Sequence, residues 1–257
     1  MMPIAGDPTP PPTSITIAAP VQPVWSVYGW LAAIILVFLI QFSFNPVGAG
    51  SDPVIQWGAK SFAHIARGEW WRLFTPIFIH ASFLHFAFNA YALYQLGRQL
   101  ERVYGAARFS AVMLVTGLAG NVLSLWFTPA PSIGASGAIF GLIGAEAVWL
   151  YRNRVLLGAR GRANLQSILS IAAINLLLGL QGGIDNWGHM GGLLGGLLLG
   201  WVIGPVWAFE QEPFTTPRIV DQNPFTFAQG AIIGLNLLGW LGLAFLALLL
   251  DPFSLTR

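Results

Sequence analysis

The chain has 257 residues, of which 55% are hydrophobic and only 9% are charged. A soluble globular domain carries roughly 25% charged residues, so this composition excludes an ordinary soluble domain and a disordered chain. The formal net charge is only +2, which excludes a broad phosphate-binding face, and we expect no nucleic-acid partner. The absence of cysteine excludes disulfides, thiolate nucleophiles and Cys-ligated zinc.

Residues 1–24 are predicted to form a flexible tail. The first 23 residues hold seven prolines, one acidic residue and no Lys or Arg. A secretory signal needs a cationic start followed by an apolar run, and this segment has neither.

Seven apolar runs follow, and a membrane-spanning helix needs about 20 residues. The runs are Trp25–Phe44, Phe83–Gly97, Phe109–Phe127, Ser136–Tyr151, Ala163–Leu180, Trp187–Trp207 and Ala228–Leu250. We therefore predict an all-α membrane protein with six spans and a separate seventh. The predicted parts are a six-span core over 25–209 with an outer loop over 45–80, a polar linker over 210–227, a seventh span over 228–250 and a C-terminal tail over 251–257.

The distribution of Arg and Lys predicts the orientation, because cytoplasmic loops are enriched in positive charge. With the N-terminus in the cytoplasm, eight of these residues lie inside and four outside, and three of those four lie in the outer loop. The prediction is a multi-pass protein of a bacterial inner membrane, with its N-terminus inside and its C-terminus outside. The outer loop carries Glu69-Trp70-Trp71-Arg72, a mixture typical of a membrane interface.

Polar residues inside a membrane are costly and therefore informative. In the predicted topology, His85, Asn89, Ser136 and His189 all lie near the outer end of spans that enter from outside. These residues are distant in the sequence but are predicted to lie at the same depth in the membrane, which is typical of a functional site.

Ser136 lies in the sequence Gly134-Ala135-Ser136-Gly137, at the predicted start of the fourth span. A helix start offers free backbone N–H groups and the positive end of the helix dipole, and both favour the negative charge of an acyl-transfer transition state. The run Ser136–Tyr151 is shorter than the hydrocarbon core, which predicts that Ser136 lies below the surface under a water-filled cavity. The alternative is a serine that only caps a glycine-rich packing helix.

His189 stands beside glycines that recur every fourth residue, at Gly188, Gly192, Gly196 and Gly200. Such a face permits very close helix contact, which could bring His189 within the roughly 3 Å that a general base requires. The alternative is a histidine with a purely structural hydrogen bond.

His85 and Asn89 are four residues apart and share one helix face, where each can donate a hydrogen bond to an oxyanion. A metal site built from His80, His85 and His189 is the weaker alternative, because the HExxH glutamate is lacking. We expect no metal and no cofactor. Glu146 is expected to be structural rather than catalytic.

These motifs together resemble the rhomboid family of intramembrane serine proteases. The resemblance covers Glu69 to about Gly200, and its motifs stand in the family's order and spacing. They are Trp71-Arg72, His80 and His85 with Asn89, Glu101 with Gly105, Gly134 to Gly137, and His189 before Gly192 and Gly196. One departure is Gly188, which replaces an alanine common before the histidine.

The resemblance implies a rhomboid-like six-helix bundle with an extra C-terminal span. It also implies that Ser136 is a nucleophile and His189 its base without a third acid. His85, Asn89 and the Ser136 N–H would form the oxyanion hole. The expected substrates are single-span membrane proteins cut near the outer face. The alternative is a catalytically silent relative that binds such clients, while a solute transporter is disfavoured because inverted repeats are not evident.

Overall fold

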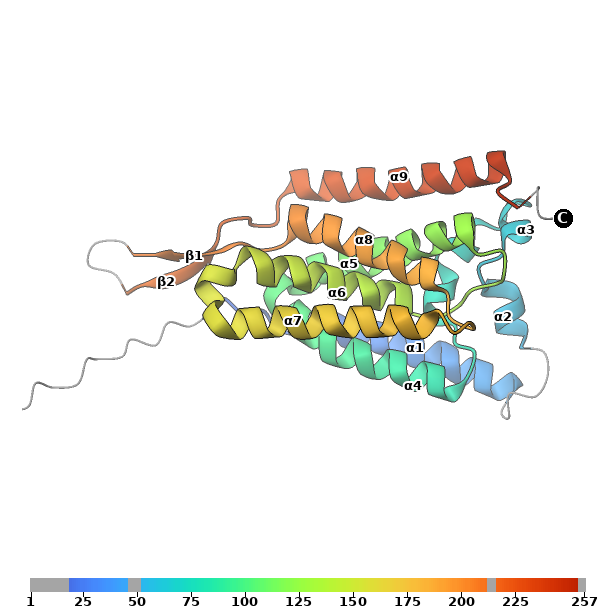
Figure 1. Ribbon diagram of the computed structural model, residues 1–257, viewed down its shortest axis with the longest axis horizontal. Helices are drawn as coiled ribbons and strands as arrows, with labels where there is room; N and C mark the ends of the chain where they lie inside the picture. Colours follow the sequence, from blue (N-terminus) through green and yellow to red (C-terminus); the bar gives the residue numbers. More distant parts are fainter. Residues whose placement is uncertain (1–18, 46–51, 212–215, 254–257) are drawn as a thin grey trace, which may run out of the picture.

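The computed structural model describes residues 19–45, 52–211 and 216–253. Most of the predicted tail over 1–24 and more than half of the predicted C-terminal tail over 251–257 therefore lie outside the described residues. The elements are α1 (Ser26–Phe44), α2 (Pro53–Gly58), α3 (Phe62–Ile65), η1 (Trp70–Leu73), η2 (Thr75–Phe78), α4 (Phe83–Ala92), η3 (Leu93–Gly97), α5 (Arg98–Phe127), α6 (Ser136–Arg152), α7 (Arg154–Gly179), α8 (Asn186–Ile203), β1 (Trp207–Glu210), β2 (Arg218–Asp221) and α9 (Phe227–Leu250). The long helices lie side by side in one bundle, with α9 along its edge (Figure 1).

Helices α5, α6 and α8 form the centre of the bundle, and glycines allow their backbones to touch. A methyl group added at Gly120 of α5 would lie 2.6 Å from the carbonyl oxygen of Gly188 in α8. One added at Gly192 or Gly196 of α8 would overlap the backbone of Gly137 or Gly141 in α6. The small-residue face predicted on the sixth span is therefore a site of close helix contact.

The second predicted span does not end at Arg98, as the sequence suggested. Helix α4 continues through a π-helical turn, η3, into α5, and the chain first leaves helical geometry at Gly105. Gly105 has φ of 76° and ψ of 164°, a conformation that residues with a Cβ rarely adopt. Arg98 was a poor marker of the helix end, because a charged side chain does not break the helical hydrogen-bond pattern. A glycine with positive φ, such as Gly105, does break it.

The sixth helix ends at Ile203, short of the predicted Trp207. Trp207 begins β1, which pairs antiparallel with β2. The two strands form a hairpin that covers the end of the predicted core and part of the predicted polar linker. Periodicity alone does not distinguish an apolar strand from the last turn of an apolar helix, which explains the error.

By length and composition, three helical stretches of the described chain could cross a membrane: α1, Phe83–Phe127 and α9. Helix α6 is shorter than these three stretches, and helix α8 is richer in glycine. Both helices are packed inside the bundle. The chain is thus mostly helical with several apolar helices, as predicted, while the count of six spans plus one stays a prediction.

The outer loop is folded onto the end of the bundle where α1 ends and α4, α6 and α8 begin (Figure 1). Glu69 and Arg72 of this loop form an ion pair, with Arg72 Nε 2.7 Å from Glu69 Oε2. The Arg72 guanidinium also donates to the carbonyl of Ala59, and Asp52 caps the first turn of α2. Polar contacts thus fix the shape of residues 52–72 of this loop.

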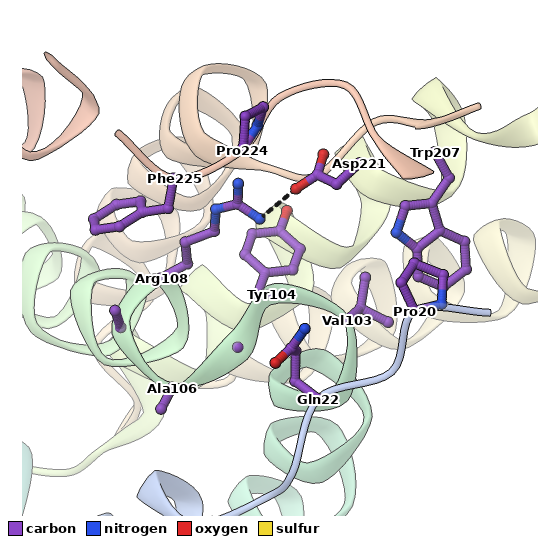
Figure 2. Close-up of a pocket in the computed structure, with 12 residues that line it drawn as sticks. Pro20, Gln22, Val103, Tyr104, Ala106, Arg108, Trp207, Asp221, Pro224 and Phe225 are labelled. Atoms are coloured by element: carbon purple, nitrogen blue, oxygen red, sulfur yellow. Dashed lines mark hydrogen bonds and ion pairs between the residues drawn. The ribbon is translucent and has the colours of Figure 1, made fainter. Parts of the chain in front are cut away.

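The opposite end of the bundle carries the hairpin, the turn at Gly105 and the residues before α1 (Figure 1). A cavity of about 310 Å³ lies there. Arg108 Nη1 is 2.9 Å from Asp221 Oδ2, and Figure 2 shows this pair among the residues that line the cavity. The start of α1 is held at this end by Glu101, whose carboxylate accepts hydrogen bonds from the backbone N–H groups of Trp25, Ser26 and Val27.

Candidate active site

Ser136 is the first residue of α6, and the loop before it is held by the outer loop. The N–H of Gly134 donates to the carbonyl of Pro76 at 2.8 Å. Gly134 has φ of +119°, and a Cβ there would lie 2.7 Å from the His85 ring. Only glycine therefore lets His85 approach the segment that carries Ser136.

His189 lies in the first turn of α8, and its Nε2 is 2.9 Å from Ser136 Oγ. Its imidazole stacks on the ring of Phe140, with centroids 4.3 Å apart and planes 12° from parallel. Phe140 comes one turn after Ser136 on the same face of α6, so a single helix presents both the hydroxyl and the surface that orients the imidazole. With the hydroxyl as donor to Nε2, the neutral ring would carry its hydrogen on Nδ1.

The hydrogen bonding of His85 identifies its donor atom. The N–H of Ala81 donates to His85 Nδ1 at 3.4 Å, so the neutral ring carries its hydrogen on Nε2. His85 Nε2 and Cε1 are the ring atoms that face Gly134, and a Cβ at Gly134 would also lie 3.8 Å from Ser136 Oγ. A hydrogen-bond donor is therefore directed toward the segment that carries Ser136.

Asn89 lies one turn further along α4 and is buried. Its Nδ2 donates to the carbonyl of His85 at 2.8 Å, which uses one of its two amide hydrogens. The structure thus brings Ser136, His189 and His85 together, and it places Asn89 directly behind His85.

His80 supports this group from the outer loop. Its ring packs edge-on against His85 at 5.2 Å, and its backbone exchanges two hydrogen bonds with the side-chain amide of Gln41 in α1. Burial, with the neighbouring His85 adding to it, lowers the pKa of His80 to about 3, so this ring is neutral at physiological pH. Among the residues that the structure describes, no three His, Cys, Asp or Glu side chains are grouped so that they could hold a metal ion.

Sequence reasoning missed three residues that shape the site: Phe140, Gln41 and Asp185. Phe140 could have been found from its spacing of four from Ser136. Asp185 lies four residues before His189 and caps α8 by accepting from the Gly188 N–H at 3.0 Å. An aspartate just before a helix is a common N-cap, so its position was a usable signal. Gln41 gave no such signal, because only the folded chain shows its contact with His80.

A small cavity of about 20 Å³ lies against Ser136 and His189, and Asp185 and Asn121 also line it. This volume suits one water molecule. A serine, a hydrogen-bonded histidine, a directed donor and space for water are the components of an acyl-transfer site.

Comparison with known proteins identifies the family of this chain. Residues 67–206, more than half of the chain, match the family described as the Rhomboid domain. The chain belongs to the rhomboid family. It is therefore an integral membrane protein, consistent with its apolar helices.

Among the rhomboid relatives is "Rhomboid protease GluP" of Bacillus subtilis, 40% identical over 178 residues, which are 69% of this chain and 34% of that protein. "Putative rhomboid protease YdcA" of the same organism is 38% identical over 139 residues, covering 52% of this chain and 68% of that protein. "RHOMBOID-like protein 6, mitochondrial" of Arabidopsis thaliana is 36% identical over 173 residues, covering 64% and 56%. The chain thus matches about a third of the length of GluP and slightly more than half of the length of this plant relative.

Proposed function

We propose that this rhomboid is an intramembrane serine endopeptidase that cleaves single-span membrane proteins near the outer membrane face. The observation that carries the proposal is the 2.9 Å hydrogen bond between Ser136 Oγ and His189 Nε2 at the start of α6. The family match and two relatives named as rhomboid proteases support it.

In the proposed reaction, Ser136 Oγ attacks the carbonyl carbon of the scissile peptide bond while His189 Nε2 takes the hydroxyl proton. Charge develops on the former carbonyl oxygen, near the N-terminus of α6. The Ser136 N–H and His85 Nε2–H are the donors to that oxyanion, and the free amide hydrogen of Asn89 is a third.

The tetrahedral intermediate then collapses. The C–N bond breaks, and His189 gives its proton to the leaving amine, which leaves an acyl ester on Ser136. A water molecule attacks the ester carbon while His189 Nε2 accepts its proton. The ester bond breaks, Ser136 Oγ regains a proton from His189, and the second product leaves as a carboxylic acid.

The orientation belongs to the same proposal. With the N-terminus in a bacterial cytoplasm, the end of the bundle that carries Ser136 and the outer loop faces outward. The Arg and Lys distribution supports this orientation.

The test is cleavage of a single-span reporter by purified protein in lipid vesicles. Ser136→Ala and His189→Ala should each lower kcat by at least about 10³-fold, because a nucleophile and its base act as a unit. The matched controls are Ser43→Ala, at an exposed serine bonded only within its own helix, and His64→Ala in α3; both should stay within about twofold of the wild type.

Cleavage by Ser136→Ala at the wild-type rate would contradict the proposed nucleophile. Specific binding of the reporter by the wild type without any cleavage would instead indicate the catalytically silent client binder.

A further inference from the structure

Asp185 fixes the first turn of α8, where His189 lies. Its Oδ1 accepts from the Gly188 N–H at 3.0 Å, and its carbonyl oxygen accepts from the His189 N–H at 3.1 Å. The same carboxylate accepts hydrogen bonds from the hydroxyls of Ser124 and Thr128 at the end of α5. The helix turn that carries His189 is thereby tied to a second helix.

Lys60 fixes the segment that leads to Ser136. Its side chain is fully buried, and its Nζ donates to the carbonyls of Thr128 and Ala130 at 2.7 and 2.8 Å. Its backbone exchanges two hydrogen bonds with Ser132, at 3.0 and 3.2 Å. The outer loop is thus attached to the α5–α6 loop four residues before Ser136.

The two groups meet at Thr128, whose carbonyl faces Lys60 and whose hydroxyl faces Asp185. Burial tends to raise the pKa of Asp185, but hydrogen bonds from Ser124, Ser132 and the Gly188 N–H, with the charge of Lys60, lower it overall. Burial lowers the pKa of Lys60 to about 8, against the opposing effect of Asp185. Both groups are therefore charged at pH 7 and lie inside the protein, and Asp185 lines the small cavity beside Ser136 and His189.

We propose that Asp185 is a positioning residue for His189 and that buried Lys60 is its counter-ion, so that one charged pair holds the segments carrying Ser136 and His189 in register. The inference rests on the proposed function. The Asp185 carboxylate lines the small cavity that Ser136 and His189 also line, and its negative charge favours the imidazolium that forms when Ser136 loses its proton. Asp185 gives and takes no proton.

The decisive variant is Asp185→Asn, because asparagine is as good an N-cap as aspartate but carries no charge. The KM for the reporter should match the wild type, while kcat and the rate of Ser136 labelling by a fluorophosphonate should each fall about 10-fold. Tm should fall, because buried Lys60 loses its counter-ion. Asp185→Leu, which also loses the cap, should lower Tm and reduce kcat further.

Lys60→Met tests the counter-ion. Alone it leaves Asp185 buried without its partner, which should lower Tm strongly. The double variant Lys60→Met/Asp185→Asn removes both charges, so its Tm should recover and its kcat should equal that of Asp185→Asn alone. Glu210→Gln, in an exposed ion pair on the distant hairpin, is the control and should change neither quantity.

Wild-type kcat in Asp185→Asn, measured beside an inactive Ser136→Ala, would overturn the positioning role and leave the proposed function intact. Strictly additive Tm changes in the double variant would overturn the counter-ion role. Undiminished cleavage by Ser136→Ala would overturn the proposed function itself, and this outcome is distinct from both.

Discussion

At the scale of single residues, the candidate site depends on the hydrogen bonds that its two histidines make. The Ala81 N–H occupies Nδ1 of His85 and leaves its Nε2–H as the donor near Ser136. The Ser136 hydroxyl occupies Nε2 of His189, whose Nδ1 has no hydrogen-bond partner within the described part of the chain. His85 thus has a ring N–H directed toward the segment of Ser136, and in the proposed reaction His189 accepts the serine proton.

His85→Ala should lower kcat by about 10²–10³-fold with little change in KM, because one oxyanion donor is lost. Asn89→Ala should have a smaller effect, because Asn89 already uses one amide hydrogen on the His85 carbonyl. The control is Phe88→Ala on the exposed face of the same helix. Steady-state cleavage kinetics provide the measurement, and unchanged kcat in His85→Ala would rule out its role as a donor.

The burial of His80 predicts a pH dependence of stability. Its pKa is about 3 in the folded protein and 6.5 ordinarily, so between these values the unfolded chain binds the proton that the folded chain excludes. Stability should therefore fall as pH falls from about 6.5 toward 3, by at most about 1.4 kcal/mol per pH unit. In His80→Phe this contribution should vanish, and Tm measured at pH 7, 5.5 and 4 should decline less than in the wild type. Parallel declines would contradict the prediction.

At the scale of elements, glycine contacts between α6 and α8 bring the dyad together. The backbone of Gly137, next to Ser136, occupies the space where a side chain of Gly192 would lie, three residues after His189. The two helices can therefore approach closely enough for the short side chain of Ser136 on α6 to form a hydrogen bond with His189 on α8.

Gly192→Ala should push α8 away from α6. We expect a loss of about 1–3 kcal/mol of stability, although alanine is intrinsically the better helix former, and at least 10-fold slower fluorophosphonate labelling of Ser136. Gly234→Ala is the matched control, because nothing lies within 4 Å of an added Cβ there. Tm and labelling rates like those of the control would show that the contact tolerates a methyl group.

At the scale of the whole molecule, the two ends of the bundle differ in chemistry. One end carries the outer loop and the candidate active site, and the other carries the hairpin and the Arg108–Asp221 pair (Figures 1 and 2). Besides Asp221, the Arg108 guanidinium contacts the carbonyl of Asn223, and its side chain is almost fully buried. This arginine therefore joins α5 to the residues that lead into α9.

Arg108→Met should lower Tm by several degrees, because Asp221 loses its partner in a partly buried position, while the Ser136 labelling rate stays within about twofold. Glu210→Gln, in an exposed pair worth at most about 1 kcal/mol, should leave Tm nearly unchanged. Loss of labelling in a folded Arg108→Met protein would show that the two ends are coupled.

The sequence by itself determined the membrane-protein class, most helix bounds and the residues that would meet. Apolar runs, glycine spacing and the few polar residues within them are local signals, and α1, α6 and α9 begin within one residue of their predicted starts. Tertiary structure decided what depends on partners distant in the chain. The hairpin that pairs Trp207 with Asp221 and the convergence of Lys60 and Asp185 on Thr128 are fixed by such partners. A buried lysine in particular could not be recognised from sequence, because only the surrounding carbonyls and the opposite charge, supplied by segments more than 60 residues away, make its burial favourable.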